Sequence, residues 1–233
     1  MKKNILAASL FAVLGLTSCK KEKTSDTPTT PTSQTSSLIR IKTEVQQNTI
    51  RNYFYDFDGK VTKDEDGSIR SNYRTYEYTS NTSVLVKRYK ADTLYSTRIY
   101  ILNKDGYAIY TEYLDDNTID TNYYDVNGFM MYSKNDQLTV KDGNVIEQIT
   151  SNDGKKEVDT ATYTYYLDRL NTIGESNHGA SFFGKDSKNL LKTEKHTSYG
   201  GNFRTYTYDF DTKGRVIKRK INNILVSSYT YID

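Results

Sequence analysis

Residues 203–233 read FRTYTYDFDTKGRVIKRKINNILVSSYTYID, and this stretch decides the fold class. Tyr206-Thr207-Tyr208 and Tyr229-Thr230-Tyr231-Ile232 follow a period of two, which places successive side chains on opposite faces of a β-strand. Asp211-Thr212-Lys213-Gly214 and Asn222-Asn223 interrupt the runs with residues that favour turns. The stretch therefore predicts short strands joined by tight turns, and strands joined in this way run antiparallel.

The same pattern extends over residues 38–233, where Tyr76-Glu77-Tyr78 and Thr162-Tyr163-Thr164-Tyr165 also alternate. Tyr, Thr, Val and Ile favour a pleated, half-buried surface. Pairs of turn residues recur between the runs, as Asp66-Gly67, Asp105-Gly106, Asn127-Gly128, Asp142-Gly143 and Asp153-Gly154. We expect an all-β domain, an antiparallel meander of about 12–14 strands. Closure into a barrel or a strongly curled sheet would protect the strand edges.

One long segment, Leu167–Ser187, breaks this rhythm. It contains three glycines, His178 and the pair Phe182-Phe183. A loop of this length in a compact domain is usually functional or disordered. The two phenylalanines favour a segment that packs back onto the domain as a plug or a lid over one barrel end.

The composition excludes two classes of protein. The chain has 233 residues, with 22 Tyr and 8 Phe, which is too aromatic for a chain that is disordered throughout. Its 32 Lys and Arg nearly balance 29 Asp and Glu, so the formal net charge is only +3. A strongly basic nucleic-acid binder is therefore not expected, and neither is a nucleic-acid partner.

The N-terminus has the pattern of a bacterial lipoprotein signal peptide, residues 1–18. Lys2 and Lys3 precede an apolar stretch that is too short to span a bilayer. The stretch ends in Leu16-Thr17-Ser18, followed by Cys19, and resembles a lipobox. Cys19 is the single cysteine of the chain, so it has no disulfide partner within it. We expect cleavage before Cys19, diacylglycerol on its sulfur, and a further acyl chain such as palmitate.

Residues 19–37 form the predicted linker between the lipidated cysteine and the domain. This stretch is rich in Thr and Ser and contains both prolines of the chain, Pro28 and Pro31. Such a composition cannot bury a core and stays extended. The expected partner is thus a membrane, contacted through the lipid on Cys19, and the expected location is the outer membrane of a Gram-negative cell. Whether the domain faces the periplasm or the cell surface is left open.

A loose motif of tyrosine, Asp and a turn glycine occurs at residues 53–61, 123–129 and 206–216, and resembles YD hairpins. Together with the lipobox, the linker and Gly184-Lys185-Asp186-Ser187-Lys188-Asn189-Leu190, it resembles a family of domain-of-unknown-function lipoproteins that are assigned a porin-like β fold. The resemblance implies a β-meander or barrel on the cell envelope and implies no activity. Charged residues within 215–220 disfavour a barrel that is itself inserted into lipid.

The sequence offers little catalytic chemistry. His178 and His196 are the only histidines, which leaves almost nothing for a catalytic triad or a histidine metal site. Acidic residues crowd Asp56-Phe57-Asp58-Gly59 and Asp64-Glu65-Asp66-Gly67, but without the spacing of an EF-hand, so we interpret both as turns. No cofactor, no metal and no catalytic residue is predicted, and we expect that the chain is not an enzyme.

Tyrosine is the one side chain in excess. Most tyrosines are expected to fill half-buried positions of the sheet, while exposed rows could stack on sugar rings or on a partner protein. The candidates for such stacking are Tyr76, Tyr78, Tyr163, Tyr165, Tyr206 and Tyr208. Three hypotheses follow: a non-catalytic binding module for a glycan or an envelope protein, a glycan-directed hydrolase, and an accessory lipoprotein of an outer-membrane transporter.

Overall fold

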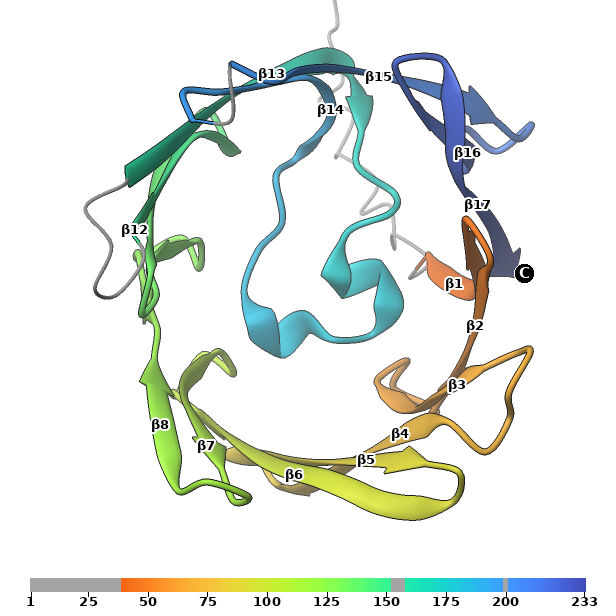
Figure 1. Cartoon of the computed structure of the whole chain (residues 1–233), viewed down its shortest axis with the longest axis vertical. Helices are drawn as coiled ribbons and strands as arrows, with labels where there is room; N and C mark the ends of the chain where they lie inside the picture. Colours follow the sequence, from red (N-terminus) through yellow and green to blue (C-terminus); the bar gives the residue numbers. More distant parts are fainter. Residues whose placement is uncertain (1–38, 152–157, 199–200) are drawn as a thin grey trace, which may run out of the picture. The chain divides into compact units, whose positions relative to one another are not determined.

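A computed structural model describes residues 39–151, 158–198 and 201–233. The predicted signal peptide, the lipobox, Cys19, the linker and the Asp153-Gly154 turn lie outside the described residues. The described chain forms seventeen β-strands and two short 3-10 helices (Figure 1). They are β1 (Arg40–Gln46), β2 (Thr49–Tyr55), β3 (Val61–Asp66), β4 (Tyr73–Ser80), β5 (Ser83–Lys90), β6 (Thr93–Leu102), β7 (Ala108–Tyr113), β8 (Thr118–Thr121), β9 (Tyr123–Tyr124), β10 (Met130–Tyr132), β11 (Asp136–Lys141), β12 (Asn144–Ser151), β13 (Val158–Leu170), η1 (Glu175–His178), η2 (Ser181–Phe183), β14 (Asn189–His196), β15 (Phe203–Phe210), β16 (Val216–Ile221) and β17 (Ile224–Ile232).

The strands form a nearly closed antiparallel barrel. Except between β8 and β9, each strand pairs with its neighbours in the chain, and the first strand, β1, pairs with the last, β17, with Arg40 opposite Ile232. The predicted all-β meander and its curling are confirmed. The predicted count of 12–14 strands was too low, because some turns carry no glycine or asparagine signal. At Ala91-Asp92, for example, both residues have positive φ (49° and 60°), yet the pair contains neither glycine nor asparagine, and alanine is untypical of this conformation.

One seam interrupts the ladder between β8 and β9. These two strands follow each other in one line, separated only by Asn122, but β8 pairs with β7 whereas β9 pairs with β10. The Asn122 backbone N–H donates to Ile109 O at 2.9 Å, and Lys134 Nζ lies 3.5 Å from Asp120 Oδ1. β8 and β9 together occupy one strand position in the barrel wall, so the seventeen strands occupy sixteen positions. An antiparallel ring needs an even number of strands to close.

Four turns of one design lie at the same rim. In each, an Asp or Asn side chain accepts the backbone N–H groups two and four residues later, and a glycine with positive φ follows at the fourth position of the turn. The four turns begin at Asp56, Asn103, Asp125 and Asp211. The motif noticed in the sequence is therefore a repeated Asx turn. The predicted tight turn at Asp66-Gly67 was wrong, because a longer loop, 67–72, joins β3 to β4.

The inside of the barrel is lined by tyrosines around two apolar clusters. One cluster is built on Val61, Val84, Val86 and Tyr100, with four further tyrosines packed against it. The other contains Ile41, Leu190, Val216 and Tyr229. Long amphipathic rings suit this position, since they fill a wide barrel and still place a hydroxyl near a polar partner.

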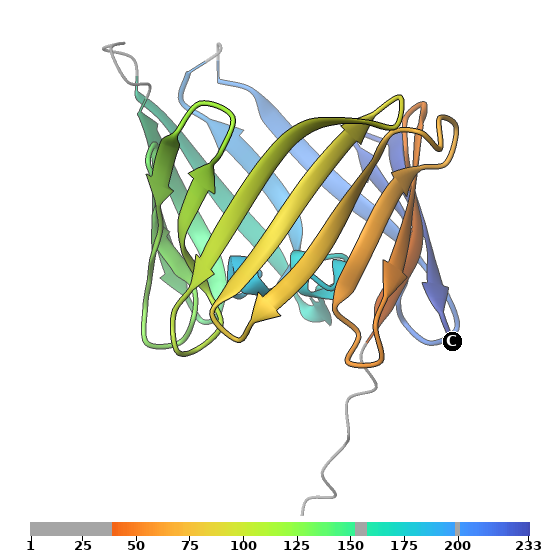
Figure 2. The ribbon, with the colours of Figure 1, turned by 90° about the horizontal axis from the view of Figure 1, so that it is seen from below.

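Residues 171–188 pass through the barrel interior rather than over its surface (Figures 1 and 2). This segment, here called the plug, contains η1 and η2 and lies toward the rim where the chain ends (Figure 2). The prediction of a plug from the Phe182-Phe183 pair is confirmed, since Phe182 is only 3% exposed. The first residues of the predicted loop, 167–170, belong instead to β13. None of the described helices is long and apolar enough to cross a membrane.

Candidate functional site

The plug is fastened to the wall by the segment Gly184–Leu190. The Lys185 N–H donates to Gly128 O at 2.8 Å, and the Lys188 N–H donates to Gly143 O at 2.8 Å. Asp186 accepts the N–H groups of Glu175 and Ser176 at 3.0 and 3.1 Å, which fixes the start of η1. These contacts give the motif Gly184–Leu190, noted in the sequence, a structural role.

The remainder of that segment continues the attachment. Ser187 Oγ accepts the Val145 N–H at 3.0 Å. Asn189 and Asn144 bond each other twice, through the Asn144 side-chain amide and through the Asn189 backbone N–H, at 3.1 and 2.9 Å. Both asparagines are buried, so this reciprocal pair satisfies polar groups that would otherwise cost stability. The plug is consequently held at a fixed height in the barrel.

An aromatic anchor holds the other half of the plug. The Phe182 ring lies 5.1 Å from the Tyr100 ring and 6.5 Å from the Tyr78 ring, centroid to centroid. Gly179 has φ of 77°, and a Cβ there would lie only 2.6 Å from Val61 N, so this position requires glycine. The plug thus contacts the wall closely on the side of β3 to β6.

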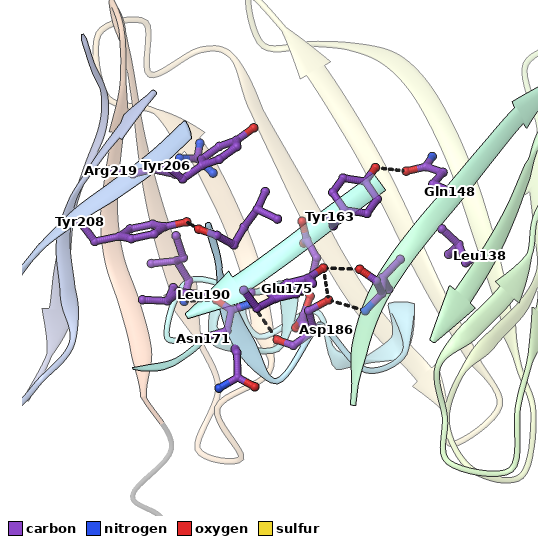
Figure 3. Close-up of a pocket in the computed structure, with 17 residues that line it drawn as sticks. Leu138, Gln148, Tyr163, Asn171, Glu175, Asp186, Leu190, Tyr206, Tyr208 and Arg219 are labelled. Atoms are coloured by element: carbon purple, nitrogen blue, oxygen red, sulfur yellow. Dashed lines mark hydrogen bonds between the residues drawn. The ribbon is translucent and has the colours of Figure 1, made fainter. Parts of the chain in front are cut away.

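The plug leaves room beside and above it. Three cavities, of about 390, 380 and 550 Å³, surround it. Glu175 lines all three cavities, which are here together called the lumen. Figure 3 shows the first of them. The first is lined by Tyr163, Tyr165, Tyr206 and Tyr208, and the second is lined by arginines. Volumes of this size suit small-molecule ligands.

Glu175 is the central titratable group of the lumen. The Glu175 side chain is accessible to water, but the barrel wall surrounds it on most sides. The resulting partial loss of hydration raises the pKa of Glu175, and the nearby His178 acts in the opposite direction. His178 Nε2 lies 3.5 Å from Glu44 Oε2. Burial alone would lower the pKa of His178, but Glu44 and Glu175 outweigh it and the pKa is raised. Burial would raise the pKa of Glu44, and His178 reverses that effect.

Four arginines from neighbouring strands line the second cavity: Arg51 on β2, Arg74 on β4, Arg88 on β5 and Arg98 on β6. Arg51 and Arg74 both bond Asp64, a β3 carboxylate that is 1% exposed, with the Arg74 Nε–Asp64 Oδ2 distance at 2.8 Å. Against these four cations the cavity lining holds two carboxylates, Glu44 and Glu175. This part of the lumen is therefore basic, and it is here called the arginine wall.

All six tyrosines predicted for ligand stacking face the interior. Four of them, Tyr163, Tyr165, Tyr206 and Tyr208, line one cavity together, and Tyr76 lines the arginine-rich cavity. Tyr78 packs against the plug. Their hydroxyls bond to protein groups, for example Tyr163 to Gln148 Oε1 at 2.8 Å. Their rings are thus available only to a ligand inside the lumen, and burial raises the pKa of Tyr206 to about 12.

The two histidines take different positions. His178 belongs to the plug, whereas His196 lies on β14, where its Nδ1 and Nε2 are 2.6 and 2.7 Å from Asp159 and Glu194. Hydrogen bonds to these two carboxylates raise the pKa of His196, and the bond to Asp159 links β14 to the neighbouring strand β13. Within the described residues no group of three or more His, Cys, Asp or Glu side chains is arranged to hold a metal ion.

Sequence reasoning missed the residues that shape the lumen. Asp64, Glu65 and Asp66 were interpreted as part of a turn, but they lie in β3, with Asp64 buried between two arginines. Each arginine lies in a strand whose two faces both carry polar residues, as Arg74 does in Tyr73–Ser80. The local sequence pattern therefore does not show which face points inward. Glu175 lies in the segment expected to be a loop, and nothing in the sequence distinguishes it from the other acidic residues.

Comparison with known proteins supports the fold class. No known family model matches this chain, and no curated protein matches it. The solved structure of a porin-like protein from Bacteroides uniformis is similar, with a TM-score of 0.54 and 17% identity, over 83% of this chain and 96% of that one. A porin-like protein from Bacteroides vulgatus matches with a TM-score of 0.41 and 11% identity, over 83% and 98% of the two chains.

The first similarity shows that the chain has a porin-like β-barrel fold, in agreement with the resemblance seen in the sequence. The identity is too low to carry more than the fold. A fold shared with other proteins does not define an activity. Function must therefore be argued from the lumen.

Proposed function

We propose that this chain is a non-catalytic binding protein of the bacterial cell envelope, which accepts a small ligand in the lumen of its barrel. The single observation that carries the proposal is the arrangement around Glu175, where three adjoining cavities remain although a plug crosses the barrel. A barrel interior that served only stability would be filled by side chains.

The carboxylates of the lumen support binding rather than catalysis. Hydrolysis of a glycan requires two carboxyl groups that are free to act on one bond. Glu175 has a raised pKa and is free of side-chain hydrogen bonds to the described residues, which favours a glycan hydrolase as the second candidate. Its neighbours are engaged, however. Glu44 pairs with His178, and Asp186 caps η1, so neither is a free partner.

The envelope assignment combines the lipobox-like sequence with the outer face of the barrel. Charged side chains lie outward on several strands, with Lys220 Nζ at 2.9 Å from Asp209 Oδ1 and Lys87 Nζ at 4.0 Å from Glu77 Oε2. A lipid-inserted barrel needs an apolar band about 25 Å tall at this place. These charges support a barrel that stands in water while an anchor on Cys19 holds it at the membrane. The role as an accessory of a transporter stays a hypothesis.

The anchor is tested by the variant Cys19→Ala. We expect the wild-type chain to incorporate labelled palmitate in a bacterial host and to sediment with membranes, because acyl chains on Cys19 bind the bilayer. The alanine variant should incorporate no label and should not be cleaved before residue 19. Label retained by the variant, or a wild-type protein whose N-terminus keeps residues 1–18, would contradict the anchor and leave the lumen unaffected.

The lumen is tested by Leu138→Trp, with Thr139→Trp as the matched control. Leu138 lines two of the cavities, whereas Thr139 follows it on β11 and faces outward. An indole at 138 should fill the space, so fluorescence enhancement of the neutral dye N-phenyl-1-naphthylamine should fall about tenfold or more. The control should bind the dye as the wild type does. Equal dye binding by both variants would place the dye outside the lumen and refute the proposal.

A further inference from the structure

We propose that β5 and β6 carry a subsite for an oxyanion, in which Arg88 and Arg98 bind a carboxylate, phosphate or sulfate group of the ligand. This inference rests on the proposed function and names the chemistry of that ligand. The argument begins with charge. One buried carboxylate, Asp64, is shared by Arg51 and Arg74, whereas Arg88 and Arg98 form no salt bridge with any described residue.

Two buried donors near these arginines have no partner in the described chain. One is Arg98 Nε itself and the other is Ser96 Oγ, and both atoms are shielded from water. A buried donor without an acceptor is costly, and a bound oxyanion is one group that would supply the missing acceptor. Ser96 and Arg98 lie two residues apart on β6, so their side chains share the inward face.

The register brings Arg88 to the same place. Ser96 on β6 lies directly opposite Arg88 on β5, and Arg98 lies opposite Val86. Arg98 is therefore the diagonal neighbour of Arg88, within the reach of two long side chains that converge on one group. The Arg98 guanidinium also lies 4.7 Å from the centroid of the Tyr113 ring, which holds its planar fork in place before a ligand arrives.

The subsite is reached through a basic passage. Arg51, Arg74 and Arg88 line the arginine-rich cavity and also a further cavity of about 320 Å³, which Lys90 and Tyr95 line as well. Lys90 ends β5 at the rim opposite the plug. On this lining four cations, Arg51, Arg74, Arg88 and Lys90, outnumber one carboxylate, Asp66, and an excess of positive charge favours entry of an anion.

The test measures binding of succinate, inorganic phosphate and sulfate, each titrated by calorimetry into the full-length protein at constant ionic strength. The variants are Arg88→Gln and Arg98→Gln, and the control is Lys87→Gln, which removes a charge from the outward face of the same strand. At least one anion should bind the wild type and the control equally. Its affinity should fall about tenfold or more in each arginine variant.

The pattern among the three anions identifies the group, since succinate presents carboxylates whereas phosphate and sulfate are tetrahedral. Arg98→Lys keeps the positive charge but loses the planar guanidinium with its paired N–H donors. Its affinity for the anion should therefore lie between those of the wild type and Arg98→Gln. Dye binding to each variant shows that the lumen is intact. If the dye enters but no anion binds, or if Arg98→Gln binds the anion as the wild type does, the subsite is refuted and the proposed function stands. If the wild-type protein binds neither the dye nor an anion, the proposed function itself is refuted, and the subsite with it.

Discussion

Asp64→Ala should lower the free energy of unfolding by about 3–5 kcal/mol, because it leaves two arginines inside the barrel without their common partner. Asp64 is 1% exposed, accepts from both Arg51 and Arg74, and also accepts the Tyr76 hydroxyl at 2.7 Å. Removal of the carboxylate therefore leaves both guanidinium groups and the Tyr76 hydroxyl without their acceptor. Urea unfolding followed by far-ultraviolet circular dichroism measures the loss.

The matched control for this change is Glu77→Ala. Glu77 lies on β4 beside Tyr76 but faces outward, 64% exposed, and its only ion pair with another described residue has an N–O distance of 4.0 Å. Surface pairs of this kind contribute little, so the control should stay within about 0.5 kcal/mol of the wild type. A loss for Asp64→Ala no greater than that of the control would show that the arginine wall is not organised around Asp64.

Phe182→Ala should cost about 3–5 kcal/mol as well, through a cavity left in the plug's anchor. The ring is 3% exposed and packs among Tyr78, Tyr100 and Phe183. The plug has few other apolar anchors. In Phe182→Ala the amides of the plug should therefore exchange with deuterium faster than in the wild type, while exchange of the strand amides changes less. Thermal unfolding gives the first quantity, and hydrogen exchange resolved over residues 171–188 gives the second.

Phe183→Ala is the appropriate comparison for this substitution. Phe183 is next in the chain and 38% exposed, so truncation removes less buried surface. Its cost should be less than half that of Phe182→Ala, with little change in exchange of the plug. Equal costs for the two variants, or exchange of the plug that Phe182→Ala leaves unchanged, would mean that residues 171–188 are not anchored inside the barrel by this ring.

Much of the fold could be predicted from the sequence because its signals are local. Alternation in Tyr206-Thr207-Tyr208 requires a strand, and the Asp211–Gly214 turn has a hydrogen-bond pattern that depends only on nearby residues. Packing of the long segment onto the domain was also predictable from its two adjacent phenylalanines, of which Phe182 is buried and Phe183 is 38% exposed. Turns such as Ala91-Asp92, whose backbone is set by the pairing of their strands, gave no such signal.

The candidate site was not predictable for a different reason. In a barrel with a polar lumen, charged and aromatic residues occur on both faces, as Arg74 inward and Glu77 outward on β4 illustrate. Polarity therefore does not distinguish the inside from the outside. The convergence of Arg51, Arg74 and Arg88 depends on the register of four strands, and a single sequence carries no direct record of register.

The central claim is that a ligand enters the lumen around Glu175, and dye titration of Leu138→Trp beside Thr139→Trp tests it most directly. The account predicts that the inward indole abolishes most of the dye's fluorescence gain, while the outward indole one residue later leaves it at the wild-type level. A wild-type protein that gives no gain, or an inward variant that binds the dye as well as its outward counterpart, would contradict it.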